Sequence, residues 1–219
     1  MNFNRKKFNI ALLGGTMVGK TSIIKSLFGE PFNESILETM GIDIINQLII
    51  FDGKKYIFKI FDTSGPERCI NIISSVIKIV DGYLLVFSYD RKDTLDTIRK
   101  WIDKIEDNCN RKEKVLILVG NKNDLYKREI TYEEGLKFAK ERNMKYFEVS
   151  AKTGFGIKEV FNELYQDIYL LNVKLKNNPL NIDERDLNKK YDNNDINEKK
   201  NNLNEKIFKM HILNKYYSL

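Results

Sequence analysis

The sequence predicts an α/β fold with three layers, in which a mostly parallel six-stranded sheet is flanked by helices on both faces. First, short apolar segments alternate with longer amphipathic segments along residues 8–175, and repeated strand–helix units form parallel sheets. Second, several apolar segments are continuous and β-branched, as strands buried on both faces are. Such sheets bind their ligands at the carboxyl ends of the strands, so we expect the functional residues in the loops that follow strands.

Six segments are expected to form strands. In chain order they are FNIALLGG (8–15), INQLIIF (45–51), KKYIFKIFD (54–62), DGYLLVFSY (81–89), EKVLILVGN (113–121) and MKYFEVSA (144–151). Between and after them, helical patterns cover 20–29, 67–79, 94–108, 131–143 and 156–175. Thr131 and Glu134 form the capping box expected to open the fourth helix. In the last helix, apolar residues recur at helical spacing: Ile157, Val160, Phe161, Leu164, Ile168 and Leu171.

The 219 residues fit one domain with a tail, and 42% hydrophobic residues suffice for one substantial core. We place the domain at 8–175 and the tail at 176–219. Within the tail, 177–202 is rich in Asn and mixed charge, which predicts disorder because too little apolar surface can be buried. The end, 203–219, regains apolar character and could form a short helix.

The net charge of +6 comes from lysines scattered over the whole chain, so nucleic acid is not an expected partner. Cys69 and Cys109 form no CxxC pair, which argues against a disulfide framework or a zinc site. The start MNFNRKKFNIALLGG is too interrupted for a signal peptide, and no apolar run reaches transmembrane length. A cytoplasmic location is therefore expected.

A phosphate-binding loop follows the first strand. GGTMVGKT, from Gly14 to Thr21, matches G-x-x-x-x-G-K-[ST] and opens the first helix. Glycines let the backbone curl so that successive N–H groups face the phosphates, aided by the helix N-terminus. Lys20 would bridge the terminal phosphates and the Thr21 hydroxyl would bind Mg²⁺. The loop predicts a nucleoside triphosphate without specifying the base.

The base is predicted from a second motif, NKND, at the end of the fifth strand. A carboxylate at Asp124 can accept hydrogen bonds from the N1–H and exocyclic amine of guanine, which adenine lacks. SAK, from Ser150 to Lys152, follows the next strand. Guanine is therefore the expected base.

This combination of motifs resembles the small GTPases of the Ras superfamily, whose fold is of the P-loop NTPase type. The motifs occur in the family's order over about residues 8–175: Gly14–Thr21, Thr39, Asp62–Gly65, Asn121–Asp124 and Ser150–Lys152. TMGIDI (39–44) and SAKTGFGIKEVF (150–161) are most similar to the Rab subfamily, and Trp101 is also typical of it.

The resemblance implies a role for each matching residue. GTP or GDP would be bound by Gly15, Thr16, Met17, Val18, Gly19, Lys20, Thr21, Ser22, Phe32, Thr39, Asp62, Gly65, Asn121, Lys122, Asp124, Ser150, Ala151 and Lys152. Mg²⁺ would be held by Thr21, Thr39 and Asp62, and catalysis would use Lys20, Thr39 and Gly65. Two switch segments, at about 33–43 and 63–78, would be ordered by the triphosphate and released by the diphosphate.

Pro66 departs from the family pattern, because it stands where a glutamine usually orients the attacking water. Proline has no side-chain donor or acceptor and biases Gly65 towards extended geometry. One hypothesis is a Rab-like switch in vesicle trafficking with slow intrinsic hydrolysis, assisted by an activating protein. The alternative is a module that holds GTP and does not use hydrolysis. A third reading, an ATP-using P-loop enzyme, is disfavoured by Asp124.

The expected partners follow from the resemblance and from its departures. An exchange factor, a GTPase-activating protein and effectors are implied, but Ile44, Val76 and Ile77 replace aromatic residues of the usual Rab effector surface. The printed chain ends in KYYSL without a cysteine and has asparagine at position 2, so neither prenylation nor N-myristoylation is expected. The basic amphipathic end of the tail supports two readings: a helix docked on the domain, or a reversible contact that places the protein peripherally on an endomembrane.

Overall fold

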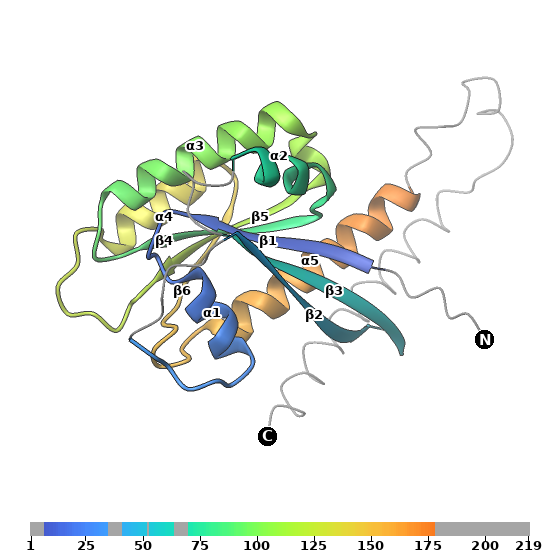
Figure 1. Ribbon diagram of the computed structural model, residues 1–219. Coiled ribbons are helices and arrows are strands. Elements are labelled where there is room, and N and C mark those ends of the chain that lie inside the picture. The colour runs from blue at the N-terminus through green and yellow to red at the C-terminus, as the bar shows by residue number, and fades with distance from the viewer. Residues whose placement is uncertain (1–6, 35–40, 52, 64–69, 178–219) are drawn as a thin grey trace, which may run out of the picture. The chain divides into compact units, whose positions relative to one another are not determined.

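The computed structural model describes residues 7–34, 41–51, 53–63 and 70–177, with the backbone alone for 70–74, 176 and 177. The described chain forms three layers around one central sheet (Figure 1). Two helices, α1 and α5, cover one face of the sheet, and α2, α3 and α4 cover the other. The α/β fold predicted from the alternation of segments is confirmed. The predicted disordered tail lies outside the described residues.

Within the described residues, six strands and five α-helices carry the fold. The strands are β1 (Lys7–Gly14), β2 (Ile42–Phe51), β3 (Lys54–Thr63), β4 (Gly82–Ser88), β5 (Val115–Asn121) and β6 (Lys145–Glu148). The helices are α1 (Lys20–Leu27), α2 (Ile70–Ile79), α3 (Asp93–Asn108), α4 (Tyr132–Glu141) and α5 (Ile157–Asn177). A 3₁₀ turn at Arg111–Glu113, absent from the sequence-based expectation, precedes β5.

The strands are ordered β2-β3-β1-β4-β5-β6. All neighbours are parallel except β2 and β3, which form an antiparallel pair with Ile42 opposite Thr63. The chain leaves β1 towards β3 on one side and returns to β4 on the other. Ligands of open α/β sheets bind where the strand order reverses in this way, at the carboxyl ends of the strands.

Alternation along the strands divides the core into two. In β1, Ala11 and Leu13 belong to the cluster that includes Trp101 of α3 and Phe138 of α4. On the other face, aromatic rings of β2 and β3 contact two tyrosines of α5, and Phe8 of β1 packs against the rings of β3. The rings concerned are Phe8, Phe51, Tyr56, Phe58, Tyr165 and Tyr169. Both faces of the central strands are thus buried, which explains their continuous apolar sequence.

Strand β2 is the exception because it lies at the edge of the sheet. Its side chains alternate between half-buried and exposed positions. Ile44, Leu48 and Ile50 are 52%, 49% and 60% exposed, so one face of this strand presents apolar side chains to solvent. Within the described residues, β2 pairs with β3 alone.

Candidate functional site

The carboxyl ends of the parallel strands bring the motif residues to one edge of the sheet. β1 ends at Gly14, β3 at Thr63, β5 at Asn121 and β6 at Glu148. The first position needs glycine, because a Cβ there would lie 2.1 Å from the carbonyl oxygen of Val86 on β4. The phosphate loop therefore begins at a position where β4 leaves no room for a side chain.

The phosphate loop curls into the start of α1. Gly19, the N-cap residue, has φ +92°, a left-handed conformation that glycine adopts without steric cost. Gly19 has no side chain that could cap this helix, and a helix N-terminus is a favourable place for an anionic ligand. Lys20 is buried, and its Nζ donates to the carbonyl oxygens of Gly15 at 2.8 Å and Gly14 at 3.4 Å. The lysine charge is thereby held against the loop.

Thr21 and Asp62 meet beside this loop. The Thr21 hydroxyl donates to Asp62 Oδ2 at 2.6 Å, although the residues are far apart in the sequence. Asp62 is 2% exposed, and its other carboxylate oxygen, Oδ1, is buried with no hydrogen-bond partner in the described part of the chain. Burial raises the pKa of this carboxyl above its ordinary value, against the opposing effects of Thr21 and Lys20. An unpaired buried oxygen next to a hydroxyl fits a small hard cation such as Mg²⁺.

Asn121, the first residue of NKND, joins three loops. Its Nδ2 donates to the carbonyl oxygen of Val18 in the phosphate loop at 2.8 Å. Its Oδ1 accepts a hydrogen bond of 3.1 Å from the backbone amide of Ala151 in the SAK motif. Because both contacts are buried, this side chain fixes the phosphate loop relative to the segments expected to contact the base.

Asp124 is aligned by the SAK motif. The Ser150 hydroxyl donates to Asp124 Oδ1 at 2.6 Å, which is the contact that the resemblance implied, and Ser150 Oγ also accepts from the Thr153 amide. Lys152 is exposed to solvent. Its Nζ lies 5.9 Å from the centre of the Phe32 ring and donates a hydrogen bond of 3.1 Å to Glu34. Phe32 and Lys152 thus lie close together, and the SAK motif that contains Lys152 also holds Asp124 through Ser150.

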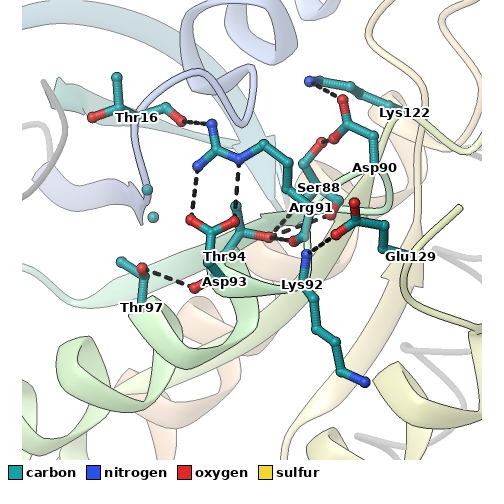
Figure 2. Close-up of polar contacts among 12 residues, drawn as sticks. Thr16, Ser88, Asp90, Arg91, Lys92, Asp93, Thr94, Thr97, Lys122 and Glu129 are labelled. Atoms are coloured by element: carbon teal, nitrogen blue, oxygen red, sulfur yellow. Dashed lines mark hydrogen bonds and ion pairs between the residues drawn. The ribbon is translucent and has the colours of Figure 1, made fainter.

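Three polar residues that the sequence did not single out support these loops. Figure 2 shows Asp90 and Arg91, from the loop between β4 and α3, reaching Lys122 and Thr16 respectively. Arg128 donates to Glu148 at 3.2 Å and to the carbonyl oxygen of Leu125 at 3.3 Å. Loop residues carry no periodic signal, so contacts of this kind are not visible in the sequence.

Other predicted residues can be placed only in part. Thr39 and Gly65, with Pro66, lie outside the described residues. Val76 and Ile77, which stand where Rab proteins usually have aromatic residues, are buried in the core, whereas Ile44 is exposed. Among the residues that the structure describes, no cluster of three or more His, Cys, Asp or Glu could hold a metal.

Comparison with known proteins agrees with this geometry. The sequence model of the Ras family matches residues 9–170. Rab-18-B of Danio rerio is 35% identical over 159 residues, covering 73% of this chain and 78% of that protein. Rab-12 of Homo sapiens is 36% identical over 183 residues (83% and 72%), and Rab-13 of Bos taurus is 33% identical over 174 residues (78% and 85%).

Ras-family members are GTPases that bind GTP or GDP with Mg²⁺, and the Rab proteins among them typically act in vesicle trafficking. In the described part of the chain, no helix combines the length and apolar character needed to cross a membrane. The family match covers nearly all of the described fold, including the phosphate loop, Asp62 and both base motifs. The chain belongs to the Ras family and is a small GTPase close to the Rab proteins.

Proposed function

We propose that this chain is a GTP/GDP switch of the Rab type in intracellular vesicle trafficking, with slow intrinsic hydrolysis of GTP. The observation that carries the proposal is the 2.6 Å contact between Thr21 and Asp62, next to the buried Lys20. It joins the phosphate loop to the strand that leads into the second switch segment. A hydroxyl, a carboxylate and an ammonium group at one point match the needs of Mg²⁺ and the terminal phosphates.

The proposed binding role divides among the chain's own residues. The amides of Gly15 to Ser22 and the Lys20 ammonium would hold the phosphates, while Thr21 and Asp62 would hold Mg²⁺. Mg²⁺ would neutralise charge on the phosphate oxygens. Asp124, aligned by Ser150, would accept the N1–H and amine of guanine. Asn121 would keep the phosphate and base subsites at a constant separation.

Slow hydrolysis is proposed because of Pro66. Catalysis by Lys20, Thr39 and Gly65 positions and polarises the γ-phosphate, but nothing at position 66 can orient the attacking water. Losing a positioned polar group costs roughly 10- to 10³-fold in rate. The alternative is a module that holds GTP without using hydrolysis, which Pro66 also favours. An activating protein that contributes its own glutamine would accelerate hydrolysis and so return the switch to its GDP-bound form.

The nucleotide recovered from the purified protein tests both ideas. The protein is denatured, and the released nucleotide is separated by chromatography. Guanine nucleotide is expected, and adenine nucleotide would contradict the proposed function. Single-turnover hydrolysis of loaded GTP is then measured with and without a Rab-directed activating protein. Turnover that rises with the activator supports the switch, and none under either condition supports the GTP-holding module.

The proposed partners are an exchange factor, an activating protein and effectors. The protein is proposed to be cytoplasmic and to make reversible peripheral contact with an endomembrane. The exposed Ile44 supports effectors that differ from those of Rab proteins with an aromatic residue there, whereas Val76 and Ile77 are buried and would change the surface by the absence of the usual rings. Affinity capture with GTP-loaded and GDP-loaded protein would identify them, because effectors are expected to prefer the GTP form.

A further inference from the structure

We propose that the loop between β4 and α3 (residues 89–92, called the bracket below) joins the phosphate loop to the NKND segment (121–124, called the guanine loop). In it, Asp90 and Arg91 act as positioning residues that lengthen the residence time of bound nucleotide. This inference rests on the proposed binding of GTP and GDP. It adds residues from a segment outside the phosphate loop and the NKND and SAK motifs.

The bracket is itself rigidly held. The backbone amide of Ser88 donates to Thr94 Oγ1 at 3.1 Å, and the Thr94 hydroxyl donates to the carbonyl oxygen of Arg91 at 2.6 Å. Ser88 and Thr94 are both fully buried. The Arg91 amide closes the turn by donating to the Ser88 carbonyl at 3.2 Å. Side chains that leave this turn therefore start from a fixed backbone.

Arg91 connects the bracket to the phosphate loop. Its Nη1 donates to the carbonyl oxygen of Thr16 at 3.2 Å, while Nε and Nη2 donate to the two carboxylate oxygens of Asp93 at 3.3 and 3.1 Å (Figure 2). The planar guanidinium is thus oriented by Asp93 while it holds Thr16. Its side chain is 38% exposed, so replacing it removes the contact without opening the core.

The contact with Thr16 has a consequence for the next amide. The Thr16 carbonyl and the Met17 N–H belong to one planar trans peptide and point in opposite directions. A cation on the carbonyl fixes that plane and polarises the N–H. Met17 has φ +60°, a conformation that a non-glycine residue holds only when its surroundings enforce it. Arg91 therefore helps to orient one of the proposed phosphate-binding amides.

Asp90 connects the same bracket to the guanine loop. Its carboxylate accepts from Lys122 Nζ at 2.8 Å and from the Ser88 hydroxyl (Figure 2). Burial opposes its ionisation, but the hydrogen bonds from Lys122 and Ser88 outweigh this and lower the Asp90 pKa below its ordinary value. The carboxylate is charged at neutral pH. Lys122 has φ +66°, so here too a contact from the bracket holds a residue in a costly conformation.

The backbone of the bracket also bonds the segments around the guanine loop. The Tyr89 amide donates to the carbonyl oxygen of Asn121 at 3.1 Å. The Lys92 amide donates to Glu129 Oε2 at 2.9 Å. Bound nucleotide would contact both ends of the bracket, so loosening either end should let it escape sooner.

Release of a fluorescent GDP analogue from the full chain with Mg²⁺ tests the proposal. Arg91→Ala and Asp90→Asn are each expected to release it about 10- to 150-fold faster than wild type, the range expected for losing a charged hydrogen bond. Arg91→Lys, which keeps the charge but loses the paired contact with Asp93, should fall between. The matched control is Arg99→Ala on α3, whose partner is the exposed Asp96; it should release at the wild-type rate.

A second measurement separates positioning from a loss of folding. In ³¹P NMR of bound GDP, Arg91→Ala should shift a phosphate resonance, while Asp90→Asn and Arg99→Ala should leave the phosphates near their wild-type positions. Circular dichroism and thermal melting check that each variant is folded. If Arg91→Ala does not fold, Arg91→Lys and Asp93→Asn address the same contact.

The failures of the two proposals are distinguishable. If the wild-type chain does not bind the GDP analogue, the proposed function is wrong. If the wild type binds it and the folded Arg91 and Asp90 variants release it at the wild-type rate, the bracket is wrong. Slower GTP hydrolysis by Arg91→Ala with unchanged GDP release and unchanged ³¹P resonances would also overturn the positioning role.

Discussion

A few buried polar side chains hold the candidate site together, and each bonds more than one segment. Asn121 bonds the phosphate loop with one end of its amide and the SAK loop with the other. Ser150 bonds Asp124 and the next turn of its own loop. Asp62 keeps a buried carboxylate oxygen that has no partner among the described residues, and such an oxygen suits the position of a ligand. The shape of the candidate site and its proposed selectivity for guanine therefore depend on single oxygen and nitrogen atoms.

The first prediction concerns the base. Asp124→Asn should weaken GTP binding by about two orders of magnitude, because an amide cannot accept from both guanine donors as a carboxylate does. The same change should improve binding of xanthosine triphosphate, whose ring presents a carbonyl in place of the amine. A competition assay with labelled GTP measures both affinities. Asp96→Asn on α3 is the matched control, and unchanged GTP affinity in Asp124→Asn would remove Asp124 from the base site.

The second prediction concerns position 66. Pro66→Gln should raise intrinsic single-turnover hydrolysis by roughly 10- to 10³-fold, because it restores an amide that can orient water. It also frees Gly65 from the restriction that a following proline imposes. Pro66→Ala separates the two causes, since it relieves the restriction without adding an amide. If Pro66→Gln hydrolyses GTP no faster than wild type, another part of the loop limits the chemistry.

At the scale of elements, sequence periodicity predicted every strand and α-helix that the structure describes, but not all their limits. β2 begins at Ile42, three residues before the expected start, because antiparallel pairing with Phe61–Thr63 extends it past Asp43. β6 ends at Glu148, since the following residues turn into the SAK loop. Such limits depend on a partner strand or a loop contact, and neither leaves a local periodic pattern.

For the candidate site, the motif residues could be predicted from the sequence, but the residues that support them could not. The loops that follow parallel strands had to converge, so the motif residues could be assigned to one site before the fold was known. Arg91 and Asp90 could not be found in this way. Their partners, Thr16 and Lys122, are distant in sequence, and only the packing of the β4–α3 loop brings them together.

The third prediction tests the contact between β1 and β4. Gly14→Ala should lower the melting temperature of the nucleotide-free protein by about 10 °C, or about 3 kcal/mol, because its Cβ would lie 2.1 Å from the Val86 carbonyl oxygen. Gly15→Ala is the matched control, since its Cβ would be 3.5 Å from the nearest atom, an ordinary contact. Thermal melting followed by circular dichroism compares them. Equal melting temperatures would contradict the proposed steric limit.

At the scale of the whole molecule, the fold accounts for the proposed nucleotide site and leaves the role of 178–219 to be tested. Leu203, Ile207, Met210 and Tyr217 approximate one helical stripe, and lysines lie among them. Both readings of this segment, a helix docked on the domain and a reversible membrane contact, follow from this pattern. Only the membrane reading predicts that the segment binds an anionic lipid surface.

The fourth prediction decides between these readings. Under the membrane hypothesis, the full chain should float with anionic liposomes, and a truncated protein ending at Lys176 should not, because the basic stripe adds apolar and electrostatic attraction. Neutral phosphatidylcholine liposomes are the control for charge. Replacing Lys206, Lys209 and Lys215 with glutamine should reduce flotation. If neither protein floats, or both float equally, recruitment would have to depend on protein partners.

The edge position of β2 also affects how the protein behaves at high concentration. The sequence IDIINQLIIF carries a single charge, and three of its outward side chains are apolar and half exposed. Such a strand can recruit the same strand from another molecule, as in the early steps of aggregation. Leu48→Lys should raise the concentration at which light scattering begins, whereas Leu175→Lys on α5, at 48% exposure, should change it little. Preparations of this protein would then be limited in solubility by β2, and one lysine would extend the usable range without touching the nucleotide site.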